Sequence, residues 1–123
     1  MKNSNKKIGT LNKKVIDLLN LDSFKNRSIY MGNKNIEHIK KIHADDYHKY
    51  GKFIKDIIKE PTYVSKHPKD RSIHYIKVFE EESKHVKIVV RPTTKNILFV
   101  RTIFTISEKN IMKYRKKNAL KTY

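Results

Sequence analysis

Cysteine is absent from the chain of 123 residues. Its absence excludes disulfides, thiolate metal ligands and a cysteine nucleophile. No apolar run approaches the roughly 18 residues that a membrane span requires, and the lysine-rich N-terminus lacks the apolar segment of a secretory signal. We therefore expect a soluble, cytoplasmic protein with no membrane partner, folded as a single domain over residues 1–123.

Acidic residues are scarce. Asp and Glu number 12 against 29 Lys and Arg, which gives a formal net charge of +17. AT-rich coding would favour Lys, Asn and Ile together, but such a bias would also supply Asp and Glu in rough balance. The surplus of positive charge therefore predicts a polyanionic partner, with RNA or another nucleic acid ahead of an anionic membrane surface.

Helical spacing is confined to three parts of the chain. Residues 1–8 are polar and basic and should be disordered, whereas apolar residues at 11, 15, 18 and 19 predict a helix over residues 10–19. A second helix should begin at Asn35 as N-cap, break near Ala44-Asp45 and end at Glu60-Pro61, because a residue before proline avoids the helical region. Residues 107–123 form a basic tail, helical from a cap at Ser107.

Strands are predicted at residues 28–31 and, at an edge, at 62–64. Three longer strands, at residues 72–79, 85–91 and 96–106, are joined by short polar connections, which favour an antiparallel meander. The predicted fold class is α+β, with helices packed on one face of a mainly antiparallel sheet and a basic C-terminal helix. Its core should span residues 28–106.

Alternation assigns the side chains of the long strands to two faces. Even-numbered residues such as Ile76, Ile88 and Val100 are apolar and should pack on the helices. The odd-numbered face carries the polar side chains of Tyr75, Lys77, Lys87, Arg91, Arg101 and Thr105. Every charge on that face is positive, so it has the donors that a phosphate requires.

Two arginines, Arg91 and Arg101, stand in otherwise apolar strands. A guanidinium there is costly unless its face meets water, an anion or a carboxylate. A merely solvated sheet face accounts for a rim residue such as Lys87, but less well for Arg101, which lies between Phe99 and Ile103. We interpret the two arginines as the binding groups for an anionic ligand rather than as members of buried ion pairs.

The histidines show no metal-ligand spacing. His38 and His43 are five residues apart, about 140° around a helix, and His43 and His48 repeat that separation. We expect no metal or other cofactor. His43 lies on the apolar stripe of its helix, as either a core histidine bonded to a backbone carbonyl or a general acid/base at the helix–sheet junction. His38 should be more exposed.

The segments IEHIKKIH, KEPTYV, SIHYIKVF, VKIVVRP and LFVRTIFTI follow one another in this order. Together they resemble the phage-associated nucleases of the barnase–EndoU–colicin–RelE-like (BECR) family, in particular a class with a histidine-pair helix and a terminal FVRT strand. The resemblance implies an α+β fold with N-terminal helices packed on one face of a four-stranded, mainly antiparallel sheet. It also implies cleavage of RNA on the open sheet face without a metal ion, by attack of the 2′-hydroxyl on the adjacent phosphate. The positions that match the family pattern are the histidine pair His38 and His43 and the strand residues Arg91, Arg101 and Thr102. The odd face has no acidic residue to match a barnase-like base, so RelE-like chemistry is the closer analogy.

The resulting hypothesis is a toxin-like endoribonuclease. Arg91 and Arg101 clamp the scissile phosphate, and Thr105 or Thr102 hydrogen-bonds a non-bridging oxygen. His43 or Lys77 removes the 2′-hydroxyl proton, and the other of the two, or Tyr75, protonates the leaving oxygen. Further RNA contacts are assigned to His38, Tyr75, Lys87, Thr102, Lys113, Arg115, Lys116 and Lys117.

Two rival hypotheses use the same basic surface without chemistry. One is a nucleic-acid-binding module, and the other is a protein that inhibits by covering a nucleic-acid surface. An antitoxin or immunity protein is a further candidate partner.

Overall fold

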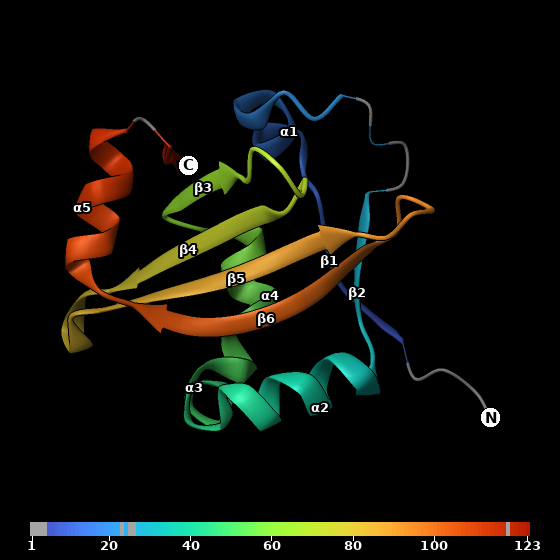
Figure 1. Cartoon of the computed structure of the whole chain (residues 1–123), viewed down its shortest axis with the longest axis horizontal. Helices are drawn as coiled ribbons and strands as arrows, with labels where there is room; N and C mark the ends of the chain where they lie inside the picture. Colours follow the sequence, from blue (N-terminus) through green and yellow to red (C-terminus); the bar gives the residue numbers. More distant parts are fainter. Residues whose placement is uncertain (1–4, 23, 25–26, 118) are drawn as a thin grey trace.

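Figure 1 shows a computed structural model of the chain, which describes residues 5–22, 24, 27–117 and 119–123. The fold is α+β, as expected. The strands are β1 (Lys6–Thr10), β2 (Ser28–Met31), β3 (Tyr63–Lys66), β4 (Ile73–Phe79), β5 (Lys84–Pro92), β6 (Leu98–Ile106) and β7 (Lys121–Thr122). The helices are α1 (Lys13–Leu19), α2 (Asn33–Ile42), α3 (Ala44–Tyr50), α4 (Ile54–Lys59) and α5 (Glu108–Lys116), with short 3-10 helices η1 (Gly51–Phe53) and η2 (Glu80–Glu82). Within the described residues, no helix has both the length and the apolar character that a membrane crossing requires.

The sheet has seven strands in the order β1-β2-β6-β5-β4-β3-β7, rather than the four predicted. The antiparallel meander β4-β5-β6 is confirmed, and β2 joins it in parallel along β6. β7 pairs with β3, so β3 is not an edge strand. Residues 1–8 were expected to be disordered. This prediction is wrong for residues 6–8, which belong to β1, and residues 1–4 lie outside the described residues.

Local capping sets the helix boundaries. Asn12 caps α1 by accepting a hydrogen bond from the backbone N–H of Val15 at 2.9 Å, so this helix begins later than predicted. α2 begins earlier than predicted, because Gly32 is its N-cap and donates its N–H to the Asn35 side chain at 2.8 Å. The predicted helix end before Pro61 and the cap at Ser107 are both confirmed.

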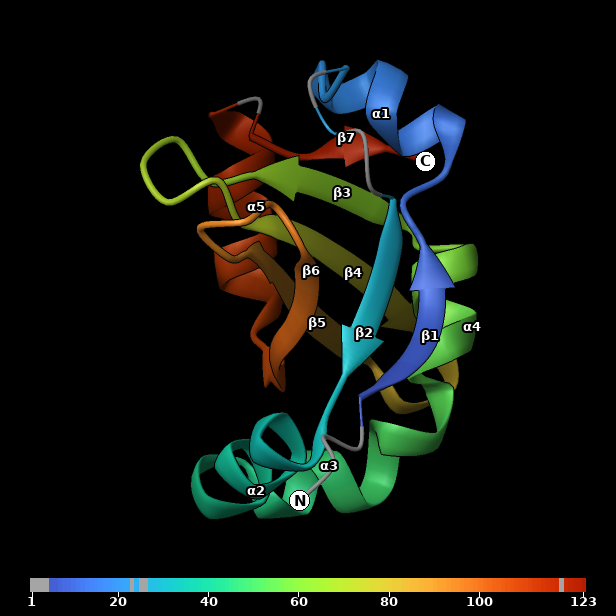
Figure 2. The same ribbon diagram turned by 90° about the vertical axis from the view of Figure 1, so that its right-hand side faces the viewer.

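One apolar core lies between α4 and the sheet. Ile54, Ile57 and Ile58 of α4 are buried in the same cluster as Ile88 of β5 and Ile103 of β6. Figure 2 shows α4 on one side of the sheet and α5 on the other. α2 and α3 lie along β6 (Figure 1). The side of β4, β5 and β6 that faces away from α4 is therefore bordered by α5 at one end and by α2 at the other.

The strand register corrects the predicted faces. Tyr75 pairs with Ile88 and Lys77 pairs with Val86, so odd-numbered residues of β4 share a face with even-numbered residues of β5. Ile88 belongs to the core, which places Tyr75 and Lys77 on the side of α4. Thr105 pairs with Val86 and lies on that side too. The prediction was wrong because it placed odd-numbered residues of all three strands on one face. Whether odd-numbered residues of one strand pair with odd- or even-numbered residues of the next depends on the length of the turn between them.

Candidate active site

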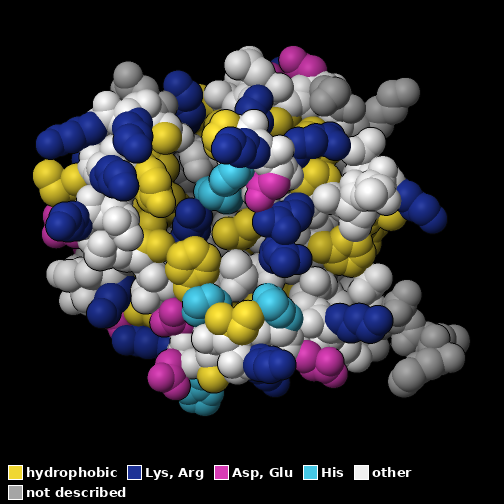
Figure 3. Space-filling view, viewed as in Figure 1, with side chains coloured by type: hydrophobic (Ala, Val, Ile, Leu, Met, Phe, Trp, Pro, Cys, Tyr) yellow, Lys and Arg dark blue, Asp and Glu magenta, His cyan; other side chains and the backbone are white. Residues whose placement is uncertain are grey.

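We call the side of the three long strands that faces away from α4 the open face. Strand pairing assigns to it His74, Ile76 and Val78 of β4, His85, Lys87, Val89 and Arg91 of β5, and Phe99, Thr102, Phe104 and Ile106 of β6. Figure 3, which has the viewpoint of Figure 1, shows Lys, Arg and His side chains gathered over the middle of this face and along its border with α2.

A β-bulge interrupts β6 at Arg101. Val89 pairs with Thr102 and Val90 pairs with Val100, which leaves Arg101 as the extra residue. Bulges re-aim side chains, and here the guanidinium is exposed. Among the described residues, Arg101 has no hydrogen-bond or ion-pair partner, and the buried Oγ1 of Thr102 has none either. In the part of the chain that the structure describes, Arg101 is therefore a free, exposed cation on the open face, next to a threonine whose hydroxyl is buried.

A cavity of about 450 Å³ lies between α2 and the ends of β5 and β6. His38 of α2, Arg91 of β5 and Arg101 of β6 all line it. Lys34 adds a third cation from the first turn of α2, and Phe99 supplies an aromatic wall. The cavity thus combines one imidazole with three positive charges, a set suited to an anionic ligand.

Arg91 has a carboxylate partner, contrary to expectation. Its Nη2 donates to Asp70 Oδ2 at 2.8 Å and its Nε donates to Ser72 Oγ at 3.1 Å. Partial burial alone would raise the pKa of Asp70, but hydrogen bonds from Ser72 and the charge of Arg91 outweigh it and lower this pKa to about 2. The Arg91 side chain remains 38% exposed, so it is held in place without being covered.

His43 turns toward the open face because the helix stops before it. α2 ends at Ile42, and His43 adopts φ −131° and ψ 50° as the cap between α2 and α3. Its ring stacks on Phe104 at 5.1 Å between centroids, with 23° between the ring planes. His38 lines the cavity beside Arg101, whereas His43 lies beside Phe104, so the two histidines meet different parts of β6. The predicted helix break is real, one residue earlier than expected.

Lys87 is 8% exposed and lies at the centre of the open face. Its Nζ lies 5.7 Å from the ring centroid of Phe104 and 5.4 Å from that of Tyr114 on α5. Burial lowers the pKa of its ammonium group. No carboxylate among the described residues pairs with it. Lys87, rather than Lys77, is therefore the lysine that the fold brings to this face.

Three predicted site residues lie elsewhere. Lys77 donates to the backbone carbonyl of Glu60 at 2.9 Å on the side of α4. Thr105 donates its backbone N–H to Asp46 Oδ2 at 3.1 Å. Tyr75 is fully buried, its hydroxyl has no partner among the described residues, and burial raises its pKa. None of the three can join Arg91 and Arg101 in a common site.

The basic tail lies on α5. Lys113, Arg115 and Lys116 are on this helix, and the Arg115 guanidinium lies 5.8 Å from the ring of Tyr63. Lys117 follows the helix and lines a second cavity, described below. These residues border the open face without entering the cavity that holds His38.

Sequence reasoning missed several residues at the open face. Tyr30 reaches it because β2 runs parallel to β6, and its ring lies 6.0 Å from that of Phe99. Asp70 and Lys34 could not be placed without the tertiary fold. Tyr114, an aromatic residue within a basic helix, carried a usable signal, because such interleaving is typical of nucleic-acid-binding segments.

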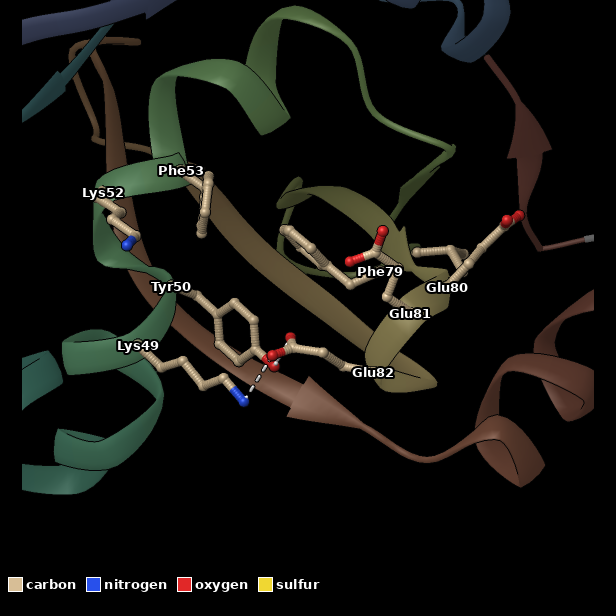
Figure 4. Close-up of a pocket in the computed structure, with 9 residues that line it drawn as sticks. Lys49, Tyr50, Lys52, Phe53, Phe79, Glu80, Glu81 and Glu82 are labelled. Atoms are coloured by element: carbon tan, nitrogen blue, oxygen red, sulfur yellow. Dashed lines mark hydrogen bonds and ion pairs between the residues drawn. The ribbon is translucent and has the colours of Figure 1, made fainter.

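A third cavity, of about 560 Å³, lies between α3, η1 and η2 (Figure 4). Tyr50 donates its hydroxyl to Glu82 at 3.1 Å, and Lys49 forms an ion pair with the same carboxylate at 2.8 Å. Glu80 and Glu81 also line this cavity. Its three carboxylates would repel a phosphate, so it does not compete with the open face as a nucleic-acid site.

Comparison with known proteins adds one match. A family model described as phage-Barnase-EndoU-ColicinE5/D-RelE like nuclease3 matches residues 6–113. Searches of curated proteins and of solved structures returned no match. Among the described residues, no group of three or more His, Asp or Glu side chains is placed to hold a metal ion.

Proposed function

The chain belongs to this family of phage-associated BECR-like nucleases, and from that premise we propose that it is a metal-independent endoribonuclease that acts on the open face. The observation that carries the proposal is the cavity in which His38 lies with Arg91 and Arg101. It offers an acid–base group and two guanidinium groups within one space. Those are the requirements for cleaving RNA by attack of its own 2′-hydroxyl.

The two arginines have different tasks. Arg91, fixed by Asp70 and Ser72, provides a preorganised donor that needs no rearrangement when substrate arrives. Arg101, exposed at the bulge, approaches the non-bridging oxygens of the scissile phosphate. The Thr102 hydroxyl is buried, so we assign it no contact with this group. The two arginines together neutralise the charge of the pentacoordinate phosphorane.

The two histidines of the α2 border supply the proton transfers. Imidazole groups exchange protons near neutral pH, and both rings lie beside β6. One imidazole removes the 2′-hydroxyl proton as the new bond from that oxygen to phosphorus forms. The other protonates the 5′-oxygen as its bond to phosphorus breaks. The products are a 2′,3′-cyclic phosphate and a free 5′-hydroxyl, with no external reactant consumed.

The test is cleavage of a labelled single-stranded RNA in EDTA, with analysis of the fragment ends. We expect cyclic phosphate ends from the wild type and a loss of about 10²–10³ in rate for Arg101→Ala. Lys55→Ala is the matched control, because it removes one positive charge from an exposed position of α4, on the opposite side of the sheet. Equal cleavage by wild type and Arg101→Ala would refute the proposed site. Bound but intact RNA would identify a non-catalytic binding protein.

In cells, the same activity would be toxin-like. Expression should degrade RNA and arrest growth, and Arg101→Ala should relieve both effects. An antitoxin or immunity protein would act most directly by covering the open face with acidic side chains.

A further inference from the structure

A second cavity opens on the same face, between the sheet and α5. Its volume is about 480 Å³, within the roughly 300–1,000 Å³ typical of ligand pockets. The residues that matter here are His67, His74, Ile76, Lys87, Tyr114 and Leu120. We call this cavity the α5 groove. Neither the proton transfers nor the phosphate clamp described above uses it.

A row of side chains connects the groove with His43. The His43 ring stacks on Phe104, Lys87 Nζ lies 5.7 Å from the centroid of the Phe104 ring, and the Tyr114 ring lies 5.4 Å from the same Nζ. Along β5, Lys87 stands four residues before Arg91, a separation of about 13 Å. An extended strand that crosses the active site along the sheet would therefore reach the groove within a few nucleotides.

The floor of the groove is a cation that lacks a counter-charge. Lys87 is 8% exposed, and the rings of Phe104 and Tyr114 flank its ammonium group. Burying a charge in this way is unfavourable unless an anion offsets it. The described part of the chain supplies no carboxylate for Lys87. A phosphate group entering the groove would do so.

The walls of the groove suit a nucleobase. Tyr114 presents a ring face, and Ile76 and Leu120 add apolar surface. His74, whose ring lies 6.1 Å from that of His67, provides nitrogen atoms that can hydrogen-bond to a base edge. Bases stack on aromatic side chains irrespective of sequence, and a nearby polar group adds preference.

We infer that the α5 groove binds one nucleotide of the RNA strand beside the scissile phosphate, with its base against Tyr114 and its phosphate on Lys87. The groove would then set the register of cleavage by holding the strand at a fixed distance from Arg101. This inference rests on the proposed function for its biological role. The binding of a nucleotide can nevertheless be measured without any cleavage.

The test titrates the wild-type protein with each of the four nucleoside 5′-monophosphates and with inorganic phosphate, followed by calorimetry and by the NMR signals of the His74 imidazole. We expect at least one nucleotide to bind at least 10-fold more tightly than phosphate. Tyr114→Ala should weaken the binding of that nucleotide at least 10-fold, and Tyr114→Trp should restore the affinity. Lys109→Ala, on the exposed part of α5, is the matched control and should bind as the wild type does.

Cleavage assays separate this inference from the proposed function. With an RNA substrate, Tyr114→Ala should raise KM about 10-fold while kcat changes less than about 3-fold. If nucleotides bind no better than phosphate, or if Tyr114→Ala and Tyr114→Trp bind alike, the inference is overturned even when RNA is cleaved. If nucleotides bind as expected but the wild type leaves RNA intact, the groove stands and the proposed nuclease activity fails.

Discussion

Acidification should destabilise the fold through His74 in a way that one substitution removes. Burial lowers the pKa of the His74 imidazole from its ordinary value of 6.5 to about 4. The positive charges of Lys87, His67 and Arg91 lower this pKa further, and the charge of Asp70 opposes them. The folded protein therefore keeps His74 neutral over a range of pH in which the unfolded chain takes up a proton.

The size of the effect follows from the two pKa values. As the pH falls below 6.5, the unfolded state binds the proton first, so the free energy of unfolding decreases, and the decrease levels off once the pH drops below about 4. The loss amounts to about 2 kcal/mol by pH 5 and about 3 kcal/mol by pH 4, relative to neutral pH. His74→Gln keeps a polar side chain on β4 but cannot titrate, so it should lack this loss.

Urea unfolding of both proteins at a series of pH values from about 7 to about 4 measures the difference. Carboxylates titrate in both proteins and cancel in the comparison. His48→Gln, which removes an exposed histidine of α3, is the matched control and should follow the wild type. Parallel stability curves for wild type and His74→Gln would show that His74 is not held neutral, and would refute the reasoning about its burial.

Two further predictions separate the faces of the sheet and the arginine contacts. Lys87→Met should raise the free energy of unfolding by about 1–2 kcal/mol, because an unpaired buried cation is removed, while RNA binding weakens; Lys77→Met should change stability by less than about 0.5 kcal/mol and leave cleavage intact. Asp70→Asn should lower stability by about 0.2–1 kcal/mol at neutral pH, since the Arg91–Asp70 pair is partly exposed. The stability due to the Asp70 charge is present above pH 3.8 and is lost as the pH falls through about 2, so the two proteins should converge there. An Asp70→Asn protein with unchanged stability and cleavage would remove Asp70 as the group that positions Arg91.

The elements that follow from local rules were predictable from the sequence. The strand at residues 28–31, the meander, the helix end before Pro61 and the cap at Ser107 all depend on a few neighbouring residues. The connections between these strands are too short for the crossover that parallel strands require, so the strands must be antiparallel. The open face was expected to be positively charged, and Arg91 and Arg101 do share a cavity on it.

The outer strands were beyond the reach of such rules. β1 is a lysine-rich segment whose pairing with β2 could not be inferred from its polar pattern, and β7 has only two residues, Lys121 and Thr122. Both are stabilised by the neighbour on which they form rather than by their own propensity. For that reason two of the three strands missing from the predicted sheet are the ones at its edges.

The turn between β4 and β5 explains why Lys87, and not the predicted Lys77, lies on the open face. The turn at residues 80–83 includes η2 and Ser83, whose φ of 52° places it in the left-handed region. Its four residues make Phe79 the partner of Lys84, which puts odd residues of β4 opposite even residues of β5. The alternation of side chains within each strand was predicted correctly, but the pairing register between two strands is set by the turn that joins them.

The bulge at Arg101 joins the core to the candidate site. Val100 and Ile103 are three residues apart, yet both are fully buried in the main cluster. A regular strand would send one of them outward, because its side chains alternate with a period of two. The extra residue allows both to enter the core and leaves Arg101 and Thr102 between them on the open side. The apolar spacing in FVRTIF is therefore a consequence of the same bulge that exposes the Arg101 guanidinium on the open face.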